Sequence, residues 1–208
     1  MTMILRTDIL QGSPEWHNIK LGVPSSSHMD CIITPGGKPS KQKEGYLYTL
    51  AAERISGMSA PSYQSQAMAD GLEKEAKSRL LYELMFDVEV EQVGVIYQTK
   101  EQKYLASPDG IINREYGLEL KNVLPKTQVK YLLDGKLPYE YIVQVQASIF
   151  ISGFSRWDFM SVAGGLPPLI IRVPRDDKFC AALKVELESF CEELDRVTDK
   201  LKGIDDNV

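Results

Sequence analysis

The chain has 208 residues, of which 43% are hydrophobic and 25% are charged, and its formal net charge is −5. This length can close a substantial core, and the composition is ordinary for a soluble globular protein. A membrane-spanning protein is excluded because no stretch approaches the ~20 apolar residues of a span. A protein that is basic over its whole surface is excluded by the net charge. We expect one domain over residues 1–208.

The cysteines and the start of the chain indicate a reducing compartment. Cys31, Cys180 and Cys191 are scattered and form no C-x-x-C pair. Neither a zinc site nor a disulfide framework is therefore expected. Residues 1–10 contain no apolar run long enough for a signal peptide. These features predict a cytoplasmic protein.

The first half of the chain is predicted to be helical. A short helix begins near Trp16 and is followed by a turn at residues 22–24 and the start of a second helix. Residues 35–39 form a basic loop. Helical periodicity then covers residues 44–56 and 67–86, with a break at 57–63. In the second of these helices one apolar stripe is expected, formed by Leu72, Ala76, Leu80 and Leu84.

The second half of the chain has strand character first. Strands are predicted over residues 88–98, 103–106, 110–113 and 117–123. Helices are then predicted at 125–133 and 139–153, strands at 156–163 and 169–173, and a long amphipathic helix at 176–202. This order predicts a mixed α/β (α+β) fold in which a central mixed β-sheet is flanked by helices.

Two short segments carry the strongest functional signal, Ser107-Pro108-Asp109-Gly110 and Gly117-Leu118-Glu119-Leu120-Lys121. The residues between them read as a β-hairpin with its turn at 113–117, which places position 109 opposite roughly 119–120. Glu119 and Lys121 are two residues apart on a strand, so their side chains share one face. Their apolar and small neighbours predict a buried strand, where charges are costly without a purpose.

Two carboxylates and a lysine at adjacent strand ends suit metal-dependent cleavage of a phosphodiester. Mg²⁺ prefers oxygen ligands, and Asp109, Glu119 and the backbone carbonyl of Leu120 can supply three. Lys121 would orient or deprotonate the attacking water if burial and the cation lowered its pKa. The alternative is a solvated turn with a cross-strand ion pair.

With these motifs, the chain resembles the lambda exonuclease family (YqaJ-type viral recombinases), a branch of the PD-(D/E)xK nuclease superfamily. The resemblance extends over nearly the whole chain. Its motifs in chain order are Trp16-His17, Leu21-Gly22-Val23-Pro24-Ser25-Ser26-Ser27, Gly71-Leu72-Glu73-Lys74-Glu75-Ala76, Ser107-Pro108-Asp109-Gly110, Leu118-Glu119-Leu120-Lys121 and Gln144-Val145-Gln146.

The resemblance implies a restriction-endonuclease-like nuclease core that degrades one strand of linear duplex DNA in the 5′→3′ direction. It implies two Mg²⁺ ions per active site, with Mn²⁺ as a substitute. The products would be 5′-mononucleotides and a 3′ single-stranded overhang for recombination by strand annealing. It further implies a homotrimeric ring around DNA, a single-strand annealing protein as partner, and a phage or prophage protein in a bacterial cytoplasm.

The same resemblance assigns catalytic residues. Asp109 and Glu119 match the metal-binding carboxylates, and Lys121 matches the catalytic lysine. Glu75 matches a helix glutamate near the metals, with a solvated glutamate as the alternative. Gln144 and Gln146 point about 200° apart around a helix axis. One of the two is expected to approach the site, and Gln144 is favoured over a core-edge amide.

The resemblance also assigns residues that contact DNA. Lys20 and Ser27 match positions that meet the 5′-phosphate of the degraded strand. An arginine is familiar at the first of these positions, and lysine lacks its bidentate fork, so dependence on a 5′-phosphate stays open. Met68 lies where the family places an apolar wedge between the strands, although a core methionine is the alternative. Lysines are also expected at the DNA backbone, or on a solvated loop, at Lys38, Lys41 and Lys43.

Two other functions fit the same residues. One is a structure- or sequence-specific endonuclease built on the same core. The other is a non-catalytic module that binds DNA ends, in which the acidic cluster is structural. His17 and His28 have no partner at ligand spacing and predict no metal site, and His17 is expected to be structural beside Trp16.

Overall fold

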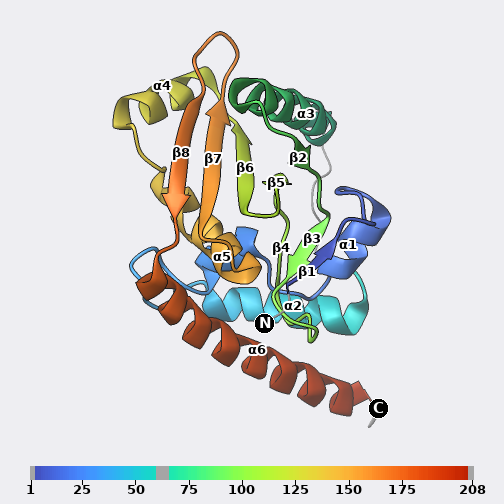
Figure 1. Cartoon of the computed structure of the whole chain (residues 1–208). Helices are drawn as coiled ribbons and strands as arrows, with labels where there is room; N and C mark the ends of the chain where they lie inside the picture. The colour runs from blue at the N-terminus through green and yellow to red at the C-terminus, as the bar shows by residue number, and fades with distance from the viewer. Residues whose placement is uncertain (1–2, 60–65, 206–208) are drawn as a thin grey trace.

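The structure is a computed structural model that describes residues 3–59 and 66–205, with side chains described for residues 3–59 and 73–204. Its centre is a five-stranded sheet (Figure 1). In spatial order the strands are β2 (Val90–Glu91), β5 (Gly110–Ile112), β6 (Tyr116–Asn122), β7 (Arg156–Val162) and β8 (Leu169–Pro174). β6 and β7 are parallel, while the other neighbours are antiparallel. The predicted mixed sheet is confirmed.

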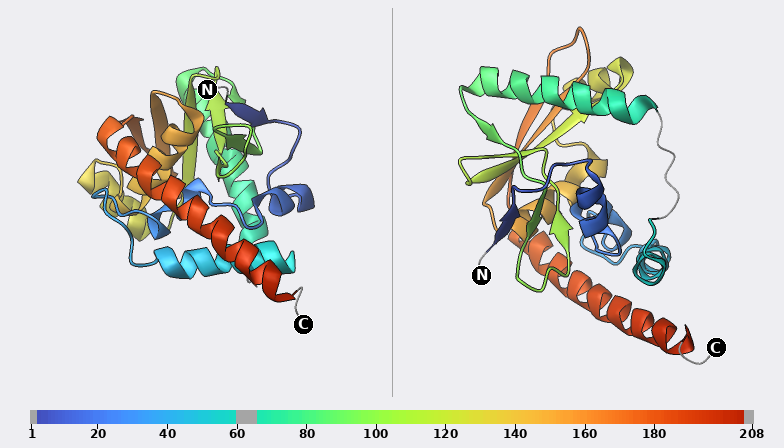
Figure 2. Two further views of the ribbon diagram at one scale, coloured as in Figure 1. Left: turned by 90° about the horizontal axis from the view of Figure 1, so that it is seen from below. Right: turned by 90° about the vertical axis from the view of Figure 1, so that its right-hand side faces the viewer.

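A second, smaller sheet contains β1 (Ile4–Arg6), β3 (Val95–Tyr97) and β4 (Leu105–Ala106). The helical elements are α1 (Pro14–Lys20), η1 (Ser26–Cys31), α2 (Lys43–Ser56), α3 (Gln66–Phe86), α4 (Pro125–Asp134), η2 (Tyr139–Tyr141), α5 (Ile142–Ser152) and α6 (Asp177–Asp205). Helices α2 and α6 lie together at the opposite end of the molecule from α3, as Figure 1 and the right-hand view of Figure 2 show. No helix in the described part of the chain is long and apolar enough to cross a membrane.

The main core lies between the five-stranded sheet, α5 and α6. Alternate residues of β7 point to opposite faces, so Trp157 and Phe159 pack toward α5, while Met160 packs toward α3. Helix α5 is buried along most of its length. The predicted apolar side of α6 is confirmed by its buried side chains, Phe179, Leu183, Leu187, Phe190 and Leu194. Burial of these aromatic and aliphatic groups fixes the sheet on which the polar residues stand.

The prediction of one strand over residues 88–98 was wrong. The segment forms β2 and β3, which belong to different sheets, and residues 92–94 connect them. Gly94 explains the break. Its N–H donates to the carbonyl of Arg6 at 2.9 Å, and an added Cβ would lie 2.4 Å from the carbonyl oxygen of Ile9. The segment crosses here toward β1, a strand that was not predicted.

Two predicted helices are shorter than expected. The helix predicted at 139–153 begins with the 3₁₀ turn η2 before α5, and the second helix predicted after residue 24 is the 3₁₀ helix η1.

Helix α3 has the predicted extent, but its apolar stripe does not face the core. Leu80 and Leu84 are 55% and 75% exposed, whereas Ser78 and Tyr82 are buried. The reason is that two polar side chains of α3 form hydrogen bonds with residues of the sheet. Ser78 Oγ donates to Asn122 Oδ1 at 2.9 Å, and Tyr82 Oη donates to Asp158 Oδ2 at 2.6 Å. Hydrogen bonds to buried sheet residues, more than apolar contact, decide which side of α3 turns inward.

The Tyr82–Asp158 hydrogen bond yields a stability prediction. Asp158 is 0% exposed, and its nearest cations, the Nε atoms of Arg156 and Arg172, are 3.7 and 3.9 Å away. Tyr82→Phe removes the hydroxyl donor and leaves a buried acceptor unpaired, so we expect a loss of ~1–3 kcal/mol in the free energy of unfolding. Urea unfolding measures this loss.

The matched control is Tyr48→Phe, which deletes a hydroxyl that donates to the exposed Glu44. In this control variant the free energy of unfolding should change by no more than ~0.5 kcal/mol. Equal losses in the two variants would contradict the importance of the buried pair.

Candidate active site

The β5–β6 hairpin brings the two predicted motifs together. Gly110 pairs with Leu118, and the N–H of Asp109 donates to the carbonyl of Leu118 at 3.1 Å. The predicted register, with position 109 beside 119–120, is confirmed. Gly110 allows a close approach, because an added Cβ would lie 2.1 Å from Cγ1 of Val90. The last two residues of the Ser107–Gly110 motif are therefore fixed by the neighbouring strands.

Asp109 is held on both its carboxylate and its carbonyl. Its Oδ2 accepts the N–H of Leu120 at 2.5 Å, and its carbonyl oxygen accepts Arg79 Nε at 3.0 Å. The first bond ties the Asp109 carboxylate to the middle of the Glu119–Lys121 segment. The second ties the turn to α3.

Glu119 and Lys121 form an ion pair at the end of β6. Glu119 is only 2% exposed, and its Oε1 lies 2.5 Å from Lys121 Nζ. The same oxygen accepts Gln144 Nε2 at 2.6 Å. Gln146 instead bonds the carbonyl of Pro174 and the N–H of Asp176, away from the carboxylates. Of the two glutamines, Gln144 is the one beside Glu119.

Glu75 approaches the same site from α3. Its Oε1 pairs with Arg79 Nη2 at 2.6 Å, one helical turn further on, and the side chain is 25% exposed. Arg79 thus bonds both Glu75 and the carbonyl of Asp109. Sequence reasoning missed this arginine, because its only signal is an i, i+4 spacing from Glu75.

The ionisable groups of the site perturb one another. Burial and then the charges of Glu119 and Glu75 raise the pKa of Asp109 well above its ordinary value. Burial, and to a lesser degree Glu119, also raises the pKa of Glu75. For Lys121, burial favours the neutral amine, but the charges of Glu119 and Asp109 outweigh it and raise the pKa. The lysine is therefore an ammonium in the protein alone.

The oxygen atoms fit a hard divalent cation only with help from other ligands. No group of three His, Cys, Asp or Glu side chains within the described ranges is arranged to hold a metal ion. Asp109 and Glu119 supply two carboxylates, so a cation there needs main-chain, water or phosphate oxygens as well, as Mg²⁺ commonly does. Repulsion of the Asp109 carboxylate by the charges of Glu119 and Glu75 also favours the binding of a cation at this site.

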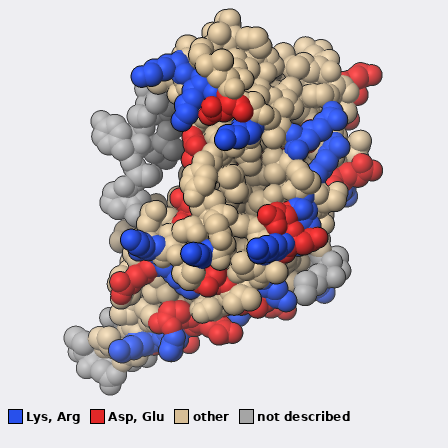
Figure 3. Space-filling model, turned by 90° about the vertical axis from the view of Figure 1, so that its left-hand side faces the viewer, with Lys and Arg blue, Asp and Glu red and all other residues tan. Residues whose placement is uncertain are grey.

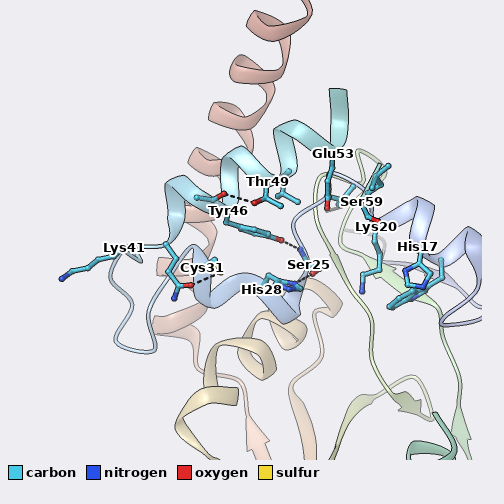
Figure 4. Close-up of a pocket in the computed structure, with 16 residues that line it drawn as sticks. His17, Lys20, Ser25, His28, Cys31, Lys41, Tyr46, Thr49, Glu53 and Ser59 are labelled. Atoms are coloured by element: carbon cyan, nitrogen blue, oxygen red, sulfur yellow. Dashed lines mark hydrogen bonds between the residues drawn. The ribbon is translucent and has the colours of Figure 1, made fainter. Parts of the chain in front are cut away.

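A cavity of about 690 Å³ lies between α1, η1 and α2. Figure 4 shows Lys20 on one side of it and Ser25 and His28 on the other. Burial lowers the pKa of Lys20 to about 8, and burial with the charge of Lys20 lowers the pKa of His28. Sequence analysis did not predict Ser25 or His28 here. The cavity is suited to an anion that would pair with Lys20.

The other predicted contacts are scattered. Ser27 is exposed beside the cavity, with its Oγ 3.0 Å from Ser25 Oγ. Lys41 lines the cavity and Lys38 is exposed, whereas Lys43 pairs with Glu186 of α6 at 2.8 Å.

Two further predictions concern Met68 and His17. Met68 belongs to α3, but its side chain lies outside the described residues. His17 packs edge-on against Trp16, with ring centroids 5.0 Å apart. On the face shown in Figure 3, basic and acidic side chains are interspersed, so this side has no continuous basic surface.

The fold is that of nucleases of the lambda exonuclease type. The alkaline exonuclease LHK-Exo from Laribacter hongkongensis superposes with a TM-score of 0.83 and 26% identity. The complex of LHK-Exo with dAMP superposes with a TM-score of 0.82 and 27% identity. Both comparisons cover 94% of this chain and 99% of the other. A phage-related exonuclease from Haemophilus somnus 129PT shares the fold, with a TM-score of 0.64 and 12% identity over 86% of this chain and 96% of the other.

Residues 15–155 match the YqaJ-like viral recombinase domain, and the chain belongs to that family. The resemblance predicted from the motifs is thereby confirmed. No curated protein sequence matches the chain.

The raised pKa of Asp109 predicts a pH-dependent gain in stability on removal of its charge. The folded state holds the Asp109 proton more tightly than the unfolded state, so the stability that this proton contributes is present below a pH of about 3.9. It is lost as the pH rises through the folded pKa, which burial and Glu119 raise. In EDTA, Asp109→Asn should therefore exceed the wild type in unfolding free energy, by a margin that is larger at pH 8 than at pH 5.

Urea unfolding at the two pH values measures this margin. The control is Asp134→Asn, which removes an exposed carboxylate at the end of α4 and gives the margin with which that of Asp109→Asn is compared. A constant margin for Asp109→Asn would contradict the like-charge interaction.

Proposed function

We propose that the protein is a metal-dependent deoxyribonuclease that degrades one strand of linear double-stranded DNA in the 5′→3′ direction. It releases 5′-mononucleotides and leaves a 3′ overhang for recombination by strand annealing. The observation that carries the proposal is the convergence of Asp109, Glu119 and Lys121 at the β5–β6 hairpin. Membership of the YqaJ-like family and similarity to LHK-Exo, an alkaline exonuclease, support it.

Asp109, Glu119 and the carbonyl of Leu120 are proposed to bind Mg²⁺, with two ions per site and Mn²⁺ as a substitute. When bound, Mg²⁺ supplies stabilisation of the charge that develops on the phosphate and the leaving oxygen. Gln144 fixes Glu119 by donating to its Oε1 at 2.6 Å. Glu75, next to these carboxylates, orients the attacking water or adds an oxygen ligand.

Lys121 is proposed to hold the attacking water and accept its proton at Nζ. Glu119 and Asp109 raise the pKa of this lysine in the protein alone, although burial opposes them. A cation that neutralises the two carboxylates removes the cause of the increase, so burial then favours the neutral amine. The same lysine can thus orient the water as an ammonium or deprotonate it as an amine.

The cavity at Lys20 is proposed to bind the terminal 5′-phosphate of the degraded strand. Among the described residues, Lys20 forms no ion pair, and burial lowers its pKa to about 8. A phosphate would pair with the ammonium of this lysine and raise its pKa again, with the Ser25 hydroxyl close by and Ser27 at the edge. Lys38 and Lys41 are proposed to contact the DNA backbone, and Met68 to separate the strands. For Lys43, whose ammonium pairs with Glu186, that role is not retained.

The family further suggests how the enzyme works in the cell. We propose a homotrimeric ring around DNA and a single-strand annealing protein as its partner, in the cytoplasm of a bacterium that carries the phage or prophage. These proposals rest on family membership.

Digestion of linear and covalently closed circular duplexes tests the function. With Mg²⁺, linear DNA should yield acid-soluble nucleotides, circular DNA should stay intact, and EDTA should abolish the release. Cleavage of the circle would favour an endonuclease on the same core. Retention of linear DNA without any nucleotide release in Mg²⁺ or Mn²⁺ would favour a non-catalytic end-binding module.

Replacement of Lys121 should separate catalysis from binding. In Lys121→Ala we expect turnover to fall by ~10²–10⁴ because the proton acceptor is lost. Affinity for DNA ends, measured by fluorescence anisotropy in Ca²⁺, should change only a few-fold. Lys130→Ala, which removes an exposed lysine of α4, is the control and should digest DNA at the wild-type rate. Wild-type digestion by Lys121→Ala would refute the assignment.

A further inference from the structure

Trp16, in α1, contacts both parts of the proposed site. Its Nε1–H donates to Ser107 Oγ and to the carbonyl of Gly94, each at 3.0 Å. Ser107 Oγ also donates to the Gly94 carbonyl at 2.7 Å, which closes a small hydrogen-bonded triangle. Ser107 lies two residues before Asp109. The edge of the indole is therefore anchored to the turn that carries a metal-binding carboxylate.

The face of the same indole supports Lys20. The ammonium of Lys20 lies 3.7 Å from the ring centroid, one helical turn after Trp16. This cation–π contact matters more for a buried cation than for an exposed one. Within the described parts of the chain no carboxylate pairs with Lys20, and burial lowers its pKa to about 8. The ring is thus the contact that holds Lys20 at the cavity before an anion arrives.

We infer that Trp16 is a positioning residue that sets the 5′-phosphate subsite at Lys20 in register with the carboxylates at Asp109. The inference rests on the proposed function and goes beyond it. A terminal phosphate bound at Lys20 places the next phosphodiester at the metal site only if the two subsites keep a fixed separation. A rigid indole that contacts Lys20 with its face and is hydrogen-bonded to Ser107 at its edge supplies that separation. Small displacements of reacting groups cost large factors in rate.

The two contacts of Trp16 can be separated by substitution. Trp16→Phe keeps an aromatic face for Lys20 but has no N–H for Ser107. Trp16→Leu keeps neither. Ser107→Ala removes one acceptor of the indole N–H without touching the ring, and Lys20→Ala removes the ammonium itself.

The experiment measures kcat/KM in Mg²⁺ on linear duplexes with a 5′-phosphate or a 5′-hydroxyl end. The wild type should prefer the phosphate about tenfold or more, and Lys20→Ala should lose the preference. Trp16→Phe and Ser107→Ala should lose about tenfold in rate on phosphorylated ends and much less on hydroxyl ends, because only a phosphate held at Lys20 has to stay in register with the carboxylates. Trp16→Leu should lose rate and retain a preference of no more than about twofold. Asn18→Ala, at an exposed position of α1, should match the wild type.

Several results would overturn the inference. A wild-type preference and rate in Trp16→Leu would do so, as would an equal loss on both ends, which indicates a purely structural tryptophan. If thermal unfolding shows that Trp16→Leu does not fold, wild-type rates in both Trp16→Phe and Ser107→Ala decide against it. A wild-type enzyme that digests both ends equally overturns this inference alone. One that leaves linear DNA intact overturns the proposed function.

Discussion

The hydrogen bond from the N–H of Leu120 to Asp109 Oδ2 fixes the geometry on which the site depends. It holds the Asp109 carboxylate against β6, next to Glu119, although two carboxylates repel each other when both are ionised. Lys121 and Gln144 offset part of that repulsion on the side of Glu119. Among the residues that the structure describes, no cation forms an ion pair with Asp109, and burial with the charges of Glu119 and Glu75 raises its pKa. A cation bound as proposed would relieve this repulsion.

The rest of the fold keeps this geometry rigid from both faces of the sheet. On one face, α3 is fastened by polar contacts at Ser78, Arg79 and Tyr82. On the other, Gln144 reaches the site from α5, a helix that is buried in the main core. At the turn itself, Gln11 Nε2 donates to the carbonyl of Pro108 at 2.6 Å and to that of Val93 at 2.9 Å. The segment before α1 and α1 itself therefore hold the turn that carries Asp109, while α1 also carries Lys20.

Sequence reasoning succeeded where one local rule determined the answer. The hairpin register follows from strand alternation and the turn at 113–115, where Asn113 and Arg114 adopt positive φ. The buried side of α6 follows from helical periodicity. Sequence reasoning failed where polar contacts between elements far apart in the sequence override helical periodicity. Leu80 and Leu84 mimic a core stripe, yet the buried Asp158, which no pattern reveals, requires the Tyr82 side instead. Ser25 and His28 could not be predicted as cavity residues, because the cavity forms only where α2 packs beside them.

Charge at the proposed site suggests how a protein of net charge −5 would engage DNA. When all are ionised, the three carboxylates of Asp109, Glu119 and Glu75 exceed the two cations of Lys121 and Arg79 by one negative charge. One divalent cation bound there would reverse the sign of the local charge, at the point where the proposed phosphodiester lies. Attraction of the DNA backbone to the site would then depend on the metal as well as on basic side chains such as Lys20 and Lys41. A net negative charge and a metal-dependent attraction are thus compatible, because beyond a Debye length of ~8 Å the distant surface charges are screened.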